Sequence, residues 1–72
     1  MKIYNFSAGP ACLPEPVLNA TQKAAIEYKG TGMSVMEMSH RSEPIVDLFH
    51  ETTSRVTELL DVPSNYHVLW LQ

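Results

Sequence analysis

The sequence predicts an α/β fold, of which these 72 residues would supply an extended arm, two helices and one strand of a larger sheet. Two patterns carry this prediction. Apolar residues recur at helical spacing over 43–60, and a near-continuous apolar, β-prone run occupies 66–72. No other run in the chain could pair with that strand, and backbone groups buried without partners are costly. We therefore expect the chain to be a piece of a larger α/β protein, or to pair with other chains.

The elements follow from local signals. Residues 1–13 combine small and turn-forming types without a regular period, which indicates an extended arm with a tight turn at Gly9-Pro10. A helix is expected over 14–29, because prolines are tolerated at a helix start and Gly30 supplies a stop. Residues 33–38 are too apolar for a free loop and too short for a helix, so we expect an extended, half-buried segment.

The second helix is expected over 43–60. Its stripe of residues at helical spacing, which we expect to be ordinary core, is Ile45, Leu48, Phe49, Thr52, Val56, Leu59 and Leu60. Asp61-Val62-Pro63 would end it, because the residue before a proline disfavours the helical conformation.

A possible anion site lies at the start of this helix. His40 and Arg41 come directly before Ser42, a good N-cap residue, so two cationic-capable side chains would lie beside free N–H groups and the positive end of the helix dipole. A carboxylate or phosphate could bind there. The alternative is an ion pair of Arg41 with Glu43 or Glu37 and a packing role for His40. From these residues alone the alternative is the commoner arrangement.

Composition excludes several classes of function. Cys12 is the single cysteine, and with three scattered histidines it has none of the short paired spacings of a zinc site, so no metal is expected. The net charge of −3 and the absence of a basic stripe argue against nucleic acid. No run is long enough to cross a bilayer, and the first residues lack the apolar region of a secretory signal, so we expect a cytoplasmic protein and no membrane partner.

Other chemistry is weakly supported. Ser7, Ser39 or Cys12 could in principle be a nucleophile for a histidine base, but no nucleophile motif surrounds them. The Gly30-Thr31-Gly32 run matches only part of a dinucleotide-binding fingerprint and follows a helix, not a strand. Periodicity and spacing therefore lead no further than an anion site on an incomplete α/β fold.

The motifs add more. The blocks Asn5-Phe6-Ser7-Ala8-Gly9-Pro10-Ala11, Met33-Ser34-Val35-Met36-Glu37-Met38-Ser39-His40-Arg41 and Val62-Pro63-Ser64-Asn65-Tyr66 occur in this order. In order and spacing the chain closely resembles the N-terminal segment of the phosphoserine aminotransferase family, within the class V pyridoxal-phosphate-dependent aminotransferases. The resemblance covers essentially all of residues 1–72.

This resemblance implies a parent enzyme of PLP fold type I that works as a homodimer with pyridoxal 5'-phosphate. It would transfer an amino group between L-glutamate and 3-phosphohydroxypyruvate, giving O-phospho-L-serine and 2-oxoglutarate in serine biosynthesis. In some bacteria it would also act on a related substrate in pyridoxine biosynthesis. The alternatives are a non-catalytic fragment or docking module, and another class V enzyme such as a desulfurase or alanine–glyoxylate aminotransferase.

The resemblance also implies site residues. Arg41 matches a substrate-binding arginine, with His40 beside it near the phosphate or distal carboxylate of the substrate. Ser7, Ala8 and Gly9 lie in the turn that approaches the amino-acid substrate, where family members often have Ser in place of Ala8. No catalytic or cofactor-binding residue is implied within 1–72, because Lys2, Lys23 and Lys29 do not match the family's catalytic position. Residues 1–72 alone are therefore expected neither to bind the cofactor nor to transaminate.

Overall fold

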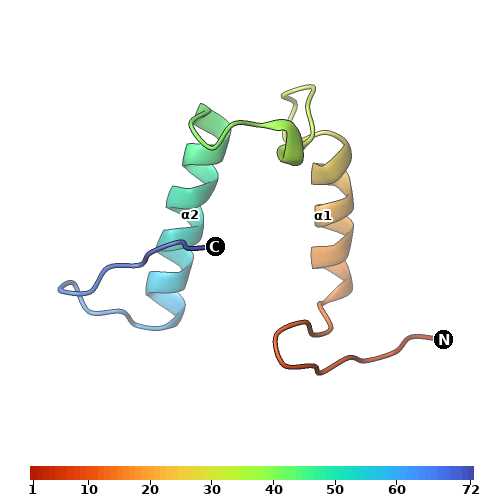
Figure 1. Cartoon of the computed structure of the whole chain (residues 1–72), viewed down its shortest axis with the longest axis horizontal. Helices are drawn as coiled ribbons and strands as arrows, with labels where there is room; N and C mark the ends of the chain where they lie inside the picture. The colour runs from red at the N-terminus through yellow and green to blue at the C-terminus, as the bar shows by residue number, and fades with distance from the viewer. The chain divides into compact units, whose positions relative to one another are not determined.

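The computed structural model describes residues 1–72 in full and divides them into two units, Met1–Glu37 and Met38–Gln72. The first unit holds the arm, helix α1 (Glu15–Ile26) and a single 3-10 turn, η1 (Val35–Glu37), which lies against α1. The second holds helix α2 (Glu43–Leu59) and the C-terminal residues (Figure 1). Neither helix has the length and apolar character needed to cross a membrane. The two predicted helices are thus present.

Helix α1 begins where the prolines predict and ends early. Pro16 lies in its first turn, where a missing N–H costs nothing. The helix ends at Ile26, three residues before the predicted boundary at 29, because Glu27 is extended. A tight turn follows, in which Tyr28 N–H donates to the carbonyl of Met33 at 2.8 Å and Gly30 has a φ of +75°. Gly30 therefore serves this turn and does not cap the helix directly.

The segment 33–38 is not extended as predicted. It contains η1, and the reason is a reciprocal pair of hydrogen bonds at its start. Glu37 Oε1 accepts from Ser34 N–H at 3.0 Å, while Ser34 Oγ accepts from Met36 N–H at 3.1 Å. This is the pattern of a capping box, in which a serine and a glutamate three residues later satisfy the free N–H groups of a helical turn. The sequence contains the signal for this turn, Ser-x-x-Glu, but the apolar residues around it favoured the prediction of an extended segment.

Helix α2 runs for 17 residues and ends at Leu59, one residue before the predicted boundary. Leu60 N–H still donates to the carbonyl of Val56, and Asp61 then takes a φ of +52°, which turns the chain away. The predicted stripe is only partly covered: Ile45 is buried, but Leu59 and Leu60 are 83% and 72% exposed. Residues 38–72 alone therefore do not make this stripe a closed core.

Residues 66–72 form no strand in this structure. A strand needs a neighbour to receive its backbone hydrogen bonds, and the single β-bridge of the chain joins Phe6 and Ala11. The segment instead turns back and crosses α2 (Figure 1), where Trp70 Nε1–H donates to Thr53 Oγ1 at 2.8 Å. The Trp70 ring also meets Phe49 edge-on, with centroids 6.2 Å apart. The strand and the larger sheet remain predictions.

Candidate functional site

The first group of predicted site residues lies in a closed loop of the arm. Ser7, Ala8 and Gly9 occupy its tip and are exposed. The loop is closed by the antiparallel bridge from Phe6 to Ala11, to which the 2.7 Å hydrogen bond from Cys12 N–H to the carbonyl of Asn5 belongs. Gly9 has a φ of +105°, a conformation that side-chain-bearing residues rarely adopt. The loop reverses the chain and places these three residues at one point.

Asn5 holds this loop from its base. Its Nδ2 donates to the carbonyl of Pro10 at 3.1 Å, and its Oδ1 accepts from the hydroxyl of Ser7 at 2.7 Å. In the sequence Asn5 stands out only as part of a motif, which does not by itself reveal this role. The signal was available, because asparagine side chains commonly bond to polar groups a few residues away and so stabilise turns.

The backbone N–H groups of Ala8 and Gly9 donate to no acceptor in the chain. Consecutive N–H groups in a turn that includes a positive φ can form a concavity that binds anions. This loop could thus receive a carboxylate through its backbone, independently of the side chain at position 8.

The second group, His40 and Arg41, lies in the turn Ser39–Ser42 before α2. Ser39 organises this turn: its Oγ accepts from Arg41 N–H at 3.1 Å, and its carbonyl accepts from Ser42 N–H at 3.0 Å. Both His40 and Arg41 are exposed. Serine hydroxyls stabilise turns in this way, so Ser39 fixes the backbone that carries the two side chains.

Arg41 forms no ion pair in the structure. The ion pair of the chain joins Arg55 and Glu51, four residues apart on α2, at 2.8 Å. Within the second unit, the predicted pair of Arg41 with Glu43 does not form. The guanidinium of Arg41 is therefore available to an anionic ligand.

Ser42 occupies the N-cap position of α2 but does not cap the helix with its side chain. Its hydroxyl donates to the carbonyl of Ser39 at 2.6 Å, while its own carbonyl accepts from the N–H groups of Ile45 and Val46. This differs from the predicted capping hydrogen bond. Without a side-chain cap, the positive end of the helix dipole stays open next to Arg41.

The two groups belong to different units, Ser7, Ala8 and Gly9 to the first and His40 and Arg41 to the second. Their combination in one binding site is part of the function proposed below.

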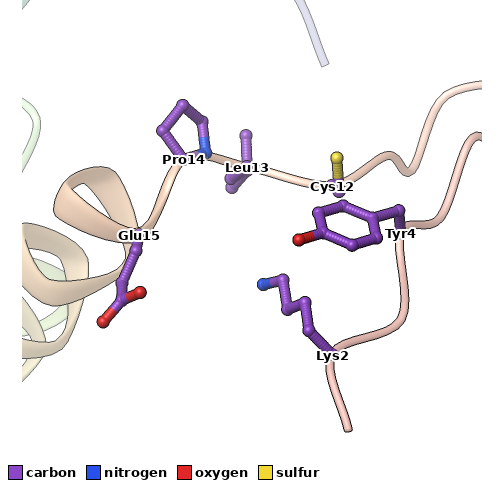
Figure 2. A pocket seen from close by; sticks show the side chains of 6 residues that line it. All are labelled: Lys2, Tyr4, Cys12, Leu13, Pro14 and Glu15. Carbon is purple, nitrogen blue, oxygen red and sulfur yellow. The ribbon is translucent and has the colours of Figure 1, made fainter.

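A hollow of about 520 Å³ lies beside the arm in the first unit. Figure 2 shows the residues that line it, with the side chains of Lys2 and Tyr4 both directed toward the side on which Glu15 lies. Cys12, half-buried, also borders it. The hollow is open and mixes a cation, a carboxylate and a thiol without directing them at a common point. No cluster of three or more metal-ligating side chains occurs in the chain.

Comparison with known proteins places the chain in a family. Residues 3–72 match the family described as aminotransferase class-V. The chain is 52% identical over 71 residues to the phosphoserine aminotransferase of Listeria monocytogenes, covering 99% of this chain and 20% of that protein. It is 56% identical over 70 residues to that of Neisseria gonorrhoeae, covering 97% and 19%. The chain thus spans about a fifth of the length of these relatives.

A third relative, the phosphoserine aminotransferase of Bacillus cereus, is 51% identical over 71 residues, covering 99% of this chain and 20% of that protein. No solved structure matches the chain. The family match extends over nearly every residue and includes both groups described above. The chain therefore belongs to the class-V aminotransferase family.

Proposed function

We propose that the protein containing these residues is a phosphoserine aminotransferase. It would transfer an amino group between L-glutamate and 3-phosphohydroxypyruvate, giving O-phospho-L-serine and 2-oxoglutarate. The observation that carries this proposal is the identity of 52–56% over almost the whole chain to proteins of that name. The proposal includes a cytoplasmic homodimer that serves serine biosynthesis and, in some bacteria, acts on a related phosphorylated substrate for pyridoxine biosynthesis.

Arg41 is proposed to bind the phosphate of one substrate or the distal carboxylate of the other. A guanidinium presents a planar fork of donors that matches both oxyanions. Its lack of an ion pair leaves this fork free, and the uncapped start of α2 adds a favourable dipole. His40, exposed in the same turn, would add a second hydrogen-bond donor near the anion.

Ser7, Ala8 and Gly9 are proposed to bind the amino-acid part of the substrate through the backbone of the loop. The free N–H groups of Ala8 and Gly9 support this role. Ala8 itself offers only a methyl group, so a hydroxyl contact that a serine could make at this position would be missing here. The binding would then depend on the conformation of the loop more than on its side chains.

Pyridoxal 5'-phosphate, when bound, would supply the electron sink on which the amino group is exchanged. Residues 1–72 do not fit this group, because Lys2, Lys23 and Lys29 are all exposed, and the hollows beside the arm and beside Lys23 and Lys29 are open. A lysine that binds the cofactor is instead activated in a desolvated pocket or beside another cation. We therefore derive no step through the cofactor from these residues, and we expect residues 1–72 alone neither to bind it nor to transaminate.

The sheet is a further part of the proposal. In the complete protein, residues 66–72 would form one strand of the large domain. The β-prone composition of this segment supports the idea, since Val68, Leu69 and Trp70 pack well on a pleated surface. A neighbouring strand would supply the hydrogen-bond partners that residues 1–72 lack.

A chimera tests the proposed function directly. Residues 1–72 would replace the matching segment of the Listeria monocytogenes relative, with that relative unchanged as the control. Solubility, far-UV circular dichroism and cofactor absorbance would establish that the chimera is folded and loaded. We expect amino transfer from glutamate to 3-phosphohydroxypyruvate and little transfer to glyoxylate. A folded, loaded chimera that used glyoxylate in preference, or neither acceptor, would contradict the proposal and favour another class V activity or a non-catalytic role.

A further inference from the structure

We propose that Asn5 is a positioning residue for substrate binding: its side-chain amide holds the loop 5–12 in the shape that lets Ser7, Ala8 and Gly9 bind a substrate carboxylate. The inference rests on the proposed function, which assigns substrate binding to those three residues. It adds a residue that acts through the loop and does not touch the substrate.

The side chain of Asn5 forms hydrogen bonds to both limbs of the loop, as a donor to one limb and as an acceptor from the other. Its Nδ2 donates to the carbonyl of Pro10 on the returning limb, at 3.1 Å. Its Oδ1 accepts from the hydroxyl of Ser7 on the outgoing limb, at 2.7 Å. One planar group therefore spans the tip of the loop, and it requires a donor and an acceptor on the same side chain.

The loop has little else to order it. Ser7, Ala8, Gly9 and Pro10 are all exposed, so no packed core fixes their positions. The base of the loop is closed by the bridge of Phe6 and Ala11, to which the hydrogen bond from Cys12 N–H to the carbonyl of Asn5 belongs, and Gly9 at a φ of +105° adds conformational freedom at the tip. The two bonds of the Asn5 amide are the contacts that reach the tip itself.

The orientation of the amide separates positioning from direct binding. Both polar atoms of the Asn5 side chain are directed at groups of the loop. The free N–H groups belong to Ala8 and Gly9, one and two residues beyond the hydroxyl that Asn5 holds. Fixing Ser7 and Pro10 on either side of them fixes the direction of those N–H groups, and preorganised donors bind an anion without a further ordering cost.

The test uses the active chimera described above with Asn5→Asp. This near-isosteric change keeps the acceptor for Ser7 and removes the donor for Pro10, and it places a negative charge beside the carbonyl that was bonded. We expect the KM for glutamate to rise about tenfold while kcat falls less than threefold, since loss of binding in the ground and transition states alike raises KM with kcat unchanged. Asn5→Ala, which loses both bonds without adding charge, should raise KM by at least as much.

Asn19→Asp is the matched control, because Asn19 is exposed in the same unit, lies on α1 and undergoes the same change of charge. It should leave both kinetic parameters within twofold of the parent chimera. A second readout is independent of activity: in the absence of substrate, hydrogen exchange of the Cys12 amide, the N–H that bonds the carbonyl of Asn5, should become several-fold faster in Asn5→Ala than in the parent chimera, while exchange in α1 stays unchanged.

The outcomes separate the two proposals. An inactive parent chimera that is folded and cofactor-loaded would overturn the proposed function and this inference with it. An active parent in which neither Asn5 variant raises KM would overturn the positioning role alone. So would an equal rise in KM from Asn19→Asp, or unchanged hydrogen exchange of the Cys12 amide. A fall in kcat with KM unchanged would also overturn it, because a loop that positions only the bound substrate would not produce that result.

Discussion

Two exposed arginines of the second unit allow a sharp test of the proposed binding role. Arg41 has no ion pair, so replacing it with glutamine should change the free energy of unfolding by no more than about 0.5 kcal/mol, the usual range for a surface substitution. Arg55 bonds Glu51 at 2.8 Å, four residues away on α2, with side chains 70% and 48% exposed. An exposed helical pair of this kind contributes about 0.3–0.5 kcal/mol.

Replacing Arg41 should impair substrate use strongly, whereas replacing Arg55 should impair it very little. A hydrogen bond to a charged group contributes about 1.5–3 kcal/mol, so Arg41→Gln should lower kcat/KM for 3-phosphohydroxypyruvate by about 10- to 150-fold. Arg55→Gln should lower it less than twofold. Arg41→Lys keeps the charge and loses the planar fork, and we expect it to fall between the two.

The assay is initial-rate kinetics on the chimera with both substrates, together with thermal unfolding of each variant. The reasoning would be refuted by equal losses of kcat/KM in Arg41→Gln and Arg55→Gln. It would also be refuted if Arg41→Gln destabilised the fold by more than about 1 kcal/mol, because that cost requires a structural partner that Arg41 does not have here.

Three further predictions concern the loop, the C-terminal segment and the turn before α2. Gly9→Ala should cost about 1–2 kcal/mol because of the φ of +105°, seen as faster hydrogen exchange of the bonded Cys12 amide, whereas an unchanged exchange rate would contradict the strain. Trp70→Phe removes the donor to Thr53 and should lower the free energy of unfolding in urea by about 0.5–1.5 kcal/mol; Thr53→Val should add nothing in that background, and a fully additive cycle would disprove the contact. Ser39→Ala removes the acceptor for Arg41 N–H and should raise the KM for 3-phosphohydroxypyruvate several-fold. Ser39→Thr, which keeps a hydroxyl, should restore the KM; if it does not, the loss is due to packing.

The helices were predictable because their signals are local. Proline in the first turn and an apolar stripe at helical spacing act within a few residues, and both helices begin within a residue of the predicted start. The ends were less predictable. The turn after α1 uses the residues that would otherwise have extended the helix. In residues 33–38, the apolar composition suggested an extended segment, although the Ser34–Glu37 capping box favours a helical turn.

The strand could not be obtained from the same reasoning. Composition identifies a segment suited to a sheet, but pairing depends on a second segment that residues 1–72 do not contain. Instead of pairing in a sheet, this segment contacts α2 through the hydrogen bond from Trp70 to Thr53. These two residues are 17 positions apart, so no local sequence pattern predicts the contact.

The candidate site residues could be proposed from the sequence, but their hydrogen bonds could not. His40 and Arg41 stand out because cationic-capable side chains precede a helix, and their exposure agrees with a binding role. The absence of a pair between Arg41 and Glu43 depends on the folded turn before α2, and spacing alone does not predict it. The role of Asn5 likewise depends on where two polar groups of a folded loop come to lie.

The unpaired guanidinium of Arg41 also bears on how fast a ligand arrives. Arg41 and Arg55 are the two lysine or arginine residues of Met38–Gln72, and Arg55 is already neutralised by Glu51. The attraction felt by a multiply charged anion approaching this unit thus comes mainly from one residue. Exposed charges are screened beyond about 8–10 Å at physiological ionic strength. Arg41→Gln should therefore slow the association of such a ligand, and should slow it more at low salt than at high salt.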